Sequence, residues 1–108
     1  MLAKKRKTYS SQKADIKPKT SRQMERHLKG VANHRRIDIL FLIAEHQGIS
    51  VDVISASLKG NMKTISMHII KLEHAGLIRK RNDGRNVMHA LSPYGIMIYK
   101  FLKTFQHS

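Results

Sequence analysis

The hydrophobic positions of residues 34–46 recur at helical spacing and cover a wide part of the expected helix surface. Asn33 precedes this run, and Asn is a favourable N-cap because its side-chain oxygen accepts hydrogen bonds from the first free amides. So broad an apolar surface predicts a central, largely buried helix. Its expected core positions are Ile37, Ile39, Leu40, Phe41, Ile43 and Ala44.

Two further helices are predicted after Gly48, which is expected to end the central one. Ser50 begins a short helix with inward positions at Val51, Ile54 and Leu58. Gly60 then breaks the chain, and Asn61 caps a helix that runs to Gly76. The core-facing stripe of this helix is expected to consist of Met62, Ile65, Ile69 and Leu72.

A β-hairpin and a last helix follow. Residues 77–81 and 86–91 alternate as two strands, and Asn82-Asp83-Gly84 between them is a strong turn signal. Ser92-Pro93 supplies an N-cap and a first helical position. With another helix at about Arg22 to Val31, the chain is predicted to be mainly α with a small β-hairpin. That order is typical of a winged helix-turn-helix: a helical core, a two-stranded wing and terminal dimerisation helices.

Composition and charge narrow the partner. The chain has 108 residues, enough for one domain, with a formal net charge of +14 and a pI near 10.6. Nucleic acid is the favoured partner, ahead of an anionic membrane surface. No apolar run reaches the length of a membrane span, and the charged start lacks the centre of a secretory signal. We therefore expect a cytoplasmic, nucleoid-associated protein and no membrane partner.

The charge divides the chain into two parts. Residues 1–26 contain nine Lys or Arg and two acidic residues, with almost no apolar side chains. Residues 27–108 contain twelve basic and five acidic residues among strongly periodic apolar ones. We predict a basic disordered arm over residues 1–20 and a winged helix-turn-helix DNA-binding domain over residues 21–108.

The helix after Asn61 is the candidate recognition helix. Opposite its apolar stripe lie Lys63, Met67, Lys71 and His74, a face that suits a major groove or, alternatively, a solvated surface. Lys63 or Asn61 is the favoured residue for direct base contact. Met67 and Ile70 are apolar on this face, so they contact thymine methyl groups or the helix is rotated.

The hairpin concentrates four cations for phosphate contact; the alternative is an edge hairpin kept soluble by charge. The complete set of expected DNA contacts is Arg36, Asn61, Lys63, Thr64, Ser66, Met67, His68, Lys71, Arg79, Lys80, Arg81 and Arg85.

The last helix has little polar surface, so it needs a cover beyond a small helical core. A two-fold dimer built from the first and last helices supplies one; the alternative is that the last helix packs back on its own domain. The expected dimer residues are Met24, Leu28, Ile98, Tyr99, Leu102 and Phe105.

Residues 30–102 resemble the winged helix-turn-helix domain of ArsR-type repressors. Residues 36–40 (RIDIL) are similar to that family's opening Arg-x-x-Ile-Leu, and residues 66–78 (SMHIIKLEHAGLI) to its Ser-x-His-Leu-x-x-Leu-x-x-Ala-Gly-Leu-Val. The resemblance implies a homodimeric prokaryotic transcription regulator with Ser66 and His68 near DNA. MarR-like and PadR-like regulators share much of this pattern.

The sequence departs from the metal-sensing members of that family. It has no cysteine, and the last helix has no Asp, Glu or His before His107, so neither of that family's metal sites is carried over. No metal or other cofactor is expected, and any small-molecule effector is unknown. His68 is interpreted as a neutral hydrogen-bond donor to DNA or a satisfied flank residue. Scattered single carboxylates also argue against an enzyme.

Two functions therefore compete. The leading hypothesis is a homodimeric, sequence-specific repressor of transcription that binds double-stranded DNA. The alternative is a nonspecific architectural DNA- or RNA-binding protein that uses the basic arm, for which deletion of residues 1–20 would remove nearly all binding. A protein-interaction module with the same fold is a further possibility.

Overall fold

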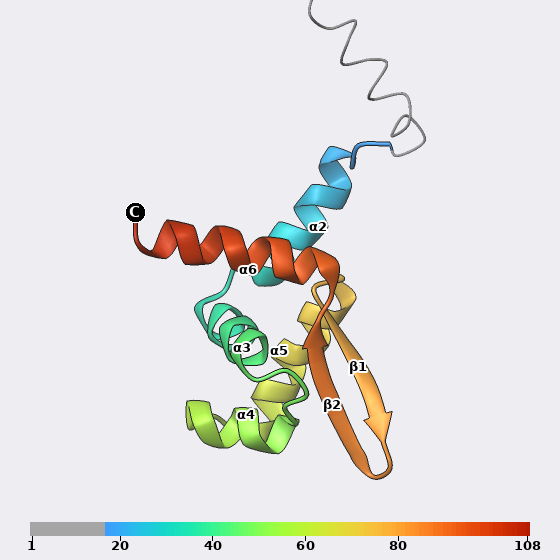
Figure 1. The fold of residues 1–108 in the computed structure, drawn as a ribbon, viewed down its shortest axis with the longest axis vertical. Coiled ribbons are helices and arrows are strands. Elements are labelled where there is room, and N and C mark those ends of the chain that lie inside the picture. Colours follow the sequence, from blue (N-terminus) through green and yellow to red (C-terminus); the bar gives the residue numbers. More distant parts are fainter. Residues whose placement is uncertain (1–16) are drawn as a thin grey trace, which may run out of the picture.

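The structure is a computed structural model that describes residues 17–108. Five helices and one hairpin follow in the order α2 (Ser21–Val31), α3 (His34–Glu45), α4 (Val51–Leu58), α5 (Met62–His74), β1 (Ile78–Asp83), β2 (Asn86–Leu91) and α6 (Pro93–Gln106) (Figure 1). Most of the predicted arm, residues 1–16, lies outside the described residues. The predicted winged helix-turn-helix fold is confirmed.

Side-chain caps fix where the helices begin. Asn33, Ser50, Asn61 and Ser92 each accept hydrogen bonds from amides of the first turn, as the sequence predicts. Helix α2 begins one residue earlier than expected, because Thr20 and Gln23 form a capping box. These local interactions explain why the predicted starts agree with the structure to within one residue.

Helix α3 lies at the centre of the core and contacts α5, α6 and β2. Its fully buried side chains are Ile39, Leu40 and Ile43, whereas Ile37, Phe41 and Ala44 are only half-buried. Of the six expected core positions, the three fully buried ones therefore face the core directly, and the other three lie at its edge. The expected stripe on α5 is correct for Ile65, Ile69 and Leu72 and wrong for Met62, which is 48% exposed. Met62 is the first residue of α5, beyond the reach of the core.

The hairpin is longer than predicted. Strands β1 and β2 pair antiparallel from Ile78 with Leu91 to Asp83 with Asn86, which leaves Gly84 and Arg85 as a two-residue turn. Asn82 and Asp83 thus belong to the strand rather than to the turn. Gly84 has φ of +65°, and Arg85 does not share a positive φ, the pattern of a type II′ turn with Gly in first place.

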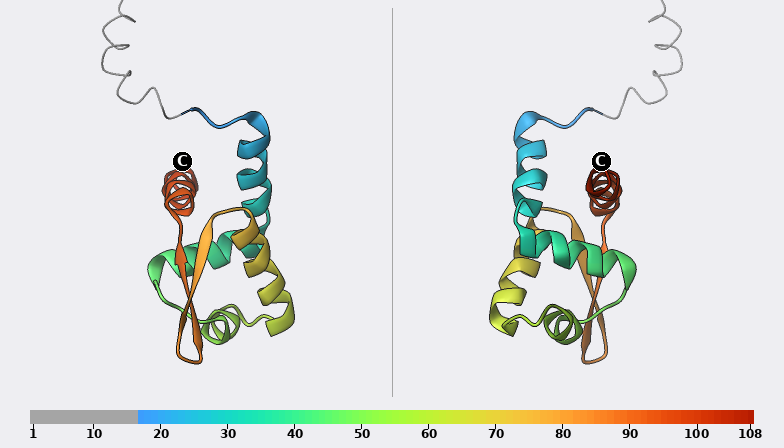
Figure 2. Two further views of the ribbon diagram at one scale, coloured as in Figure 1. Left: turned by 90° about the vertical axis from the view of Figure 1, so that its right-hand side faces the viewer. Right: turned by 90° about the vertical axis from the view of Figure 1, so that its left-hand side faces the viewer.

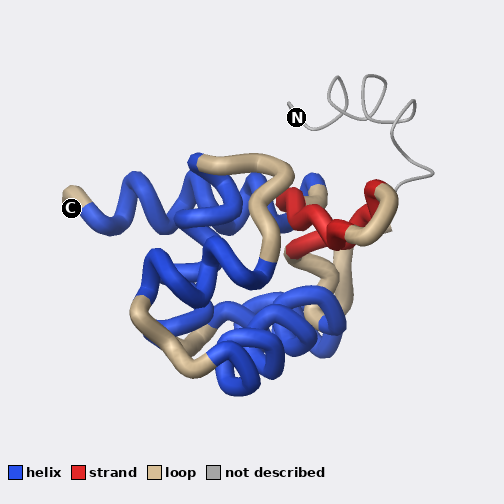
Figure 3. The backbone as a smooth tube through the Cα atoms, turned by 90° about the horizontal axis from the view of Figure 1, so that it is seen from below, coloured by secondary structure: helices blue, strands red, loops and turns tan. Residues whose placement is uncertain are grey.

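The base of the hairpin is fixed to the loop between α3 and α4. Buried His89 exchanges backbone hydrogen bonds with this loop, and its Nδ1 donates to the Ile49 carbonyl at 2.9 Å. The other end of the hairpin projects away from the helices (Figure 3). In side view, the tip of the hairpin, α4 and the start of α5 all reach the same end of the molecule (Figure 2). Within residues 17–108, no helix combines the length and hydrophobicity needed to cross a bilayer.

Candidate nucleic-acid interface

Helix α5 presents a polar and apolar face to solvent. Lys63, Lys71 and His74 are exposed there, together with Met67 at 53% and Ile70 at 43%. The opposite side is anchored in the core by Ile65, Ile69 and Leu72. The orientation of α5 expected from its periodicity is therefore correct, and the two apolar side chains do lie on the outer surface rather than in a rotated core.

The first turn of α5 is organised by Asn61. Its side-chain oxygen accepts hydrogen bonds from the amides of Lys63 at 2.9 Å and Thr64 at 3.2 Å. Because that oxygen is occupied, Asn61 holds the helix start in shape and has only its amide NH₂ left for a base. Lys63 and Thr64 are both exposed on this turn. Lys63 is therefore the stronger of the two candidates for direct base contact.

His68 lies half-buried on the side of α5 that faces α3. Arg36 Nε donates a hydrogen bond to His68 Nδ1 at 3.3 Å, which leaves the proton of the neutral ring on Nε2. Desolvation lowers the pKa of His68, and the positive charges of Arg36, Arg35 and Lys71 lower it further. The ring is thus held neutral, with one N–H donor whose position is set by Arg36.

Arg36 itself serves the fold. Besides His68, its guanidinium donates to the carbonyls of Gly30 at 3.0 Å and Lys29 at 3.3 Å, at the end of α2. The sequence predicts Arg36 as a DNA contact, but Nε and Nη1 of its half-buried side chain make these three hydrogen bonds within the fold. We therefore assign Arg36 to bracing α2, α3 and α5 against one another.

The four cations of the hairpin do not share one surface. Arg79 and Arg81 alternate with Lys80 along β1. The two arginines therefore lie on one face of the ribbon and Lys80 lies on the other. Lys80 Nζ lies 3.2 Å from Glu73 Oε1 of α5, an ion pair that partly neutralises it. Arg81, and Arg85 in the turn, are exposed near the hairpin tip. Of the four predicted cations, Arg81 and Arg85 therefore lie near the tip, Lys80 is paired with Glu73, and Arg79 lies further back along the strand.

Sequence reasoning missed the attachment of α2 to the end of α5. Arg26 Nη1 donates to the His74 carbonyl at 2.9 Å, and His27 Nδ1 donates to the Ala75 carbonyl at 2.6 Å. A Cβ at Gly30 would overlap the Cβ of Ala75, so only glycine allows this close approach. The His and Gly are visible in the sequence, but their common partner Ala75 lies 48 residues after His27 and 45 after Gly30.

The predicted dimer residues divide between two surfaces. Met24, Leu28 and Phe105 are exposed, at 46%, 54% and 63%. Ile98, Tyr99 and Leu102 instead pack against the core of their own chain, where the Tyr99 ring contacts Phe41 edge-on with centroids 5.1 Å apart. Exposed apolar residues that the prediction omitted are Met97 at 66% and Phe101 at 59%. We call the set Met24, Leu28, Met97, Phe101 and Phe105 the outer apolar face.

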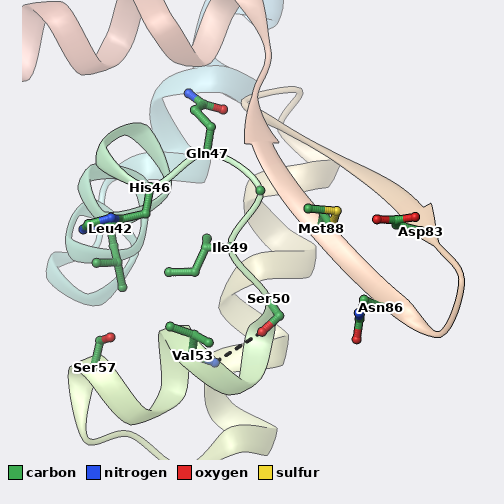
Figure 4. A pocket seen from close by; sticks show the side chains of 11 residues that line it. Leu42, His46, Gln47, Ile49, Ser50, Val53, Ser57, Asp83, Asn86 and Met88 are labelled. Carbon is green, nitrogen blue, oxygen red and sulfur yellow. Dashed lines mark hydrogen bonds between the residues drawn. The ribbon is translucent and has the colours of Figure 1, made fainter.

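A hollow of about 580 Å³ lies between the loop after α3, the start of α4 and the hairpin (Figure 4). His46, Ser50, Ser57 and Asp83 line it. Within the described part of the chain, no hydrogen bond links His46 to either serine or to Asp83. The Ser50 hydroxyl instead caps α4, accepting from the Val53 amide at 3.5 Å. The arrangement of an activated nucleophile is thus not formed here.

Potential metal ligands are also scattered. Residues 17–108 contain no group of three His, Asp or Glu side chains placed to hold a metal ion.

Comparison with known proteins yields structural matches only: the sequence matches no protein-family model and no curated protein. HlyU from Vibrio cholerae N16961 is similar at 26% identity and TM-score 0.74, over 85% of this chain and 100% of that one. A homodimeric winged helix-turn-helix DNA-binding domain from Mycobacterium bovis, Mb0332, a possible ArsR-family transcriptional regulator, is similar at 22% identity and TM-score 0.72, over 85% and 91%.

A third solved structure, a possible transcriptional regulator for arsenical resistance, has 27% identity and TM-score 0.61, with 72% of this chain and 80% of that one covered. The chain therefore has the winged helix-turn-helix fold, and its resemblance to ArsR-type transcriptional regulators is confirmed.

Proposed function

We propose that this protein is a prokaryotic, sequence-specific transcriptional regulator, which binds double-stranded DNA as a homodimer and represses transcription in the cytoplasm, on the nucleoid. The observation that carries the proposal is that the start of α5, whose outer side chains are exposed, and the hairpin tip reach the same end of the molecule (Figure 2). A helix and a basic ribbon at one end match a groove and its flanking phosphates. The similar solved structures described as transcriptional regulators support the same function.

In this proposal, α5 enters the major groove with its first turns deepest. Lys63 contacts base edges, and Thr64, Ser66 and Lys71 contact bases or phosphates nearby. The Nε2–H of His68 supplies one further donor from the flank of the helix. Arg81 and Arg85 bind phosphates from the wing, because they are exposed and form no ion pair with an acidic side chain of residues 17–108.

A homodimer follows from the outer apolar face. Met24 and Leu28 of α2 and Met97, Phe101 and Phe105 of α6 are all between 46% and 66% exposed. Large apolar side chains exposed together mark an interaction surface. The similar domain from Mycobacterium bovis is described as homodimeric. We infer that two copies pair through this face and present two α5 helices to half-sites about 34 Å apart, or a multiple of that spacing.

The proposed activity is binding rather than catalysis. His46, Ser50, Ser57 and Asp83 share a hollow without the hydrogen bonds that would activate a nucleophile. The solved structures to which the chain is similar are likewise described as regulators. A dimer bound across a promoter would repress by excluding the polymerase.

The test is selection from a pool of random duplex DNA at about 200 mM salt, where purely electrostatic binding is suppressed. Enrichment of an inverted repeat is expected. A Lys63→Ala variant should lose affinity for the selected sequence, while a Lys100→Ala variant, on the exposed surface of α6, serves as the matched control. Binding at low salt without any enriched sequence would contradict the proposal.

The basic N-terminal residues provide the competing explanation. Deleting residues 1–16 removes five Lys or Arg side chains and leaves the Thr20 cap of α2 in place. If the winged domain reads DNA, the truncated protein selects the same inverted repeat with a shallower salt dependence. Loss of nearly all binding would favour the nonspecific architectural or RNA-binding role.

A further inference from the structure

A small apolar pocket of about 320 Å³ lies between α2 and the first turns of α6. Its size is at the lower end of the range that holds small ligands. Carbon-rich side chains dominate its walls, and Lys19, the one cation there, lies over the Tyr94 ring with Nζ 3.7 Å from the centroid. The lining residues are Lys19, Met24, His27, Leu28, Tyr94, Met97 and Ile98.

His27 lines this pocket and carries a buried polar atom behind its apolar wall. The side chain is only 5% exposed, and its Nδ1 donates to the Ala75 carbonyl at 2.6 Å. Since a carbonyl oxygen only accepts, Nδ1 carries the proton, and Nε2 of the neutral ring is an acceptor. Nε2 has no hydrogen-bond partner, the sole buried side-chain nitrogen or oxygen in residues 17–108 of which this is true. Such a group is costly to leave unpaired.

We propose that this pocket binds a small, uncharged, mainly apolar molecule with one hydroxyl or N–H group, which donates a hydrogen bond to His27 Nε2 and acts as the regulator's effector. The effector part rests on the proposed function. The Tyr94 ring, with its centroid 4.9 Å from that of His27, covers the imidazole and is itself 44% exposed. An outward turn of Tyr94 admits the ligand.

The pocket is one hydrogen bond away from the recognition helix. His27 binds Ala75, the C-cap of α5, and Arg26 binds the neighbouring carbonyl of His74. A ligand on Nε2 polarises the imidazole and strengthens the Nδ1–H hydrogen bond to Ala75. Met24, Leu28 and Met97 also belong to the outer apolar face, so the ligand lies beneath the partner protomer. Its binding therefore alters how α5 is held relative to the dimer.

The first experiment is calorimetric titration of the full chain with 2-naphthol and with 2-methylnaphthalene, in which a methyl group replaces the hydroxyl. We expect 2-naphthol to bind about fivefold more tightly, the worth of one hydrogen bond. Methionine methyl shifts of Met24 and Met97, followed by NMR, place the ligand, and Met88 of the hairpin is the internal control. Equal affinities, or no binding, would overturn the proposal.

The matched variant is His27→Asn. The Asn side-chain nitrogen occupies the place of Nδ1 and keeps the donor to Ala75, while the acceptor at Nε2 is lost. The variant should unfold at a temperature close to that of the wild type and bind both naphthalenes equally. Retention of the preference for 2-naphthol would contradict the role of Nε2. If the variant fails to fold, Leu28→Trp, which fills the pocket from a half-exposed position, should abolish 2-naphthol binding instead.

The effector role has a separate readout. Saturating 2-naphthol should change the affinity of the wild type for its selected DNA at least threefold, and leave that of His27→Asn unchanged. Binding of 2-naphthol without any change in DNA affinity would refute the effector role. If random duplexes yield no selected sequence but 2-naphthol still binds more tightly than 2-methylnaphthalene, the proposed function is wrong. The proposed ligand site at His27 is then still supported.

Discussion

At the scale of single residues, hydrogen bonds decide which cations are free for DNA. Arg36 donates to Gly30, Lys29 and His68, whereas Arg85 is exposed in the wing turn. Arg36→Ala should therefore lower the free energy of unfolding by about 1–3 kcal/mol, because it leaves partly buried acceptors unpaired. The salt dependence of DNA binding should stay unchanged, since no phosphate contact is lost. Urea denaturation and binding isotherms at several salt concentrations measure the two effects.

Arg85→Ala is the matched comparison. It should leave the unfolding free energy within about 0.5 kcal/mol and make the slope of log affinity against log salt about one unit shallower. A reversed pattern, with Arg36→Ala changing the slope and Arg85→Ala changing stability, would show that the roles assigned to these two arginines are wrong.

His68 gives the protein a pH dependence with a defined sign. Burial, with Arg36, Arg35 and Lys71 nearby, lowers the pKa of His68 below the ordinary 6.5, and His34 of α3 adds to the effect. As pH falls below 6.5, the unfolded chain takes up this proton before the native one does. The stability that neutral His68 contributes is therefore fully present above pH 6.5. It is lost as the pH falls toward the lowered pKa of the native state.

The His68→Gln variant isolates this contribution, because it changes no other ionisable side chain. Between pH 7.5 and 5.5, thermal unfolding of the wild type should shift further toward low temperature than that of the variant. Identical pH profiles for the two proteins would show that His68 is not the group responsible.

At the scale of elements, the sequence predicts what depends on neighbours along the chain. The caps at Asn33, Ser50, Asn61 and Ser92 are local, so the helix starts were predictable. The exposure of Met62 was not, because it depends on how far the core extends along α5. The hairpin illustrates both cases: strand alternation already separates Lys80 from Arg79 and Arg81, but its pairing with Glu73 requires the placement of α5.

Helix α5 carries an apolar contribution to base recognition. Met67 and Ile70 are 53% and 43% exposed, and they lie three residues apart on the proposed groove side. The apolar group in the major groove is the thymine methyl. We predict thymines within the selected half-sites and a loss of about fourfold in affinity when one contacted thymine is replaced by deoxyuridine.

The pairing of methyl group and side chain can be tested by a double-mutant cycle. In Met67→Ala or Ile70→Ala, one of the deoxyuridine effects should disappear, while replacement of thymines outside the half-sites has no effect in any variant. Half-sites without thymine, or a methyl effect that persists in both variants, would leave α5 reading DNA through its polar side chains alone.

At the scale of the whole molecule, formation of the proposed dimer and its binding to DNA should respond to salt in opposite directions. Each protomer carries a formal charge of +14, so two copies repel each other and salt screens that repulsion. DNA binding, by contrast, weakens with salt because counterions are released from the phosphates. In the proposed dimer, burial of the outer apolar face supplies the attraction that holds two such protomers together at low salt.

That argument predicts the effect of one charge placed on α6. Phe101 is 59% exposed and stacks on Phe105 with centroids 5.7 Å apart, so Phe101→Glu puts a carboxylate into the proposed dimer face. Sedimentation should show a monomer, and affinity for the full inverted repeat should fall about 100-fold, with half-site affinity unchanged. Ile96→Glu makes the same charge change on another side of α6 and should remain dimeric. A dimeric Phe101→Glu protein would require that the two α5 helices be brought together by a different surface.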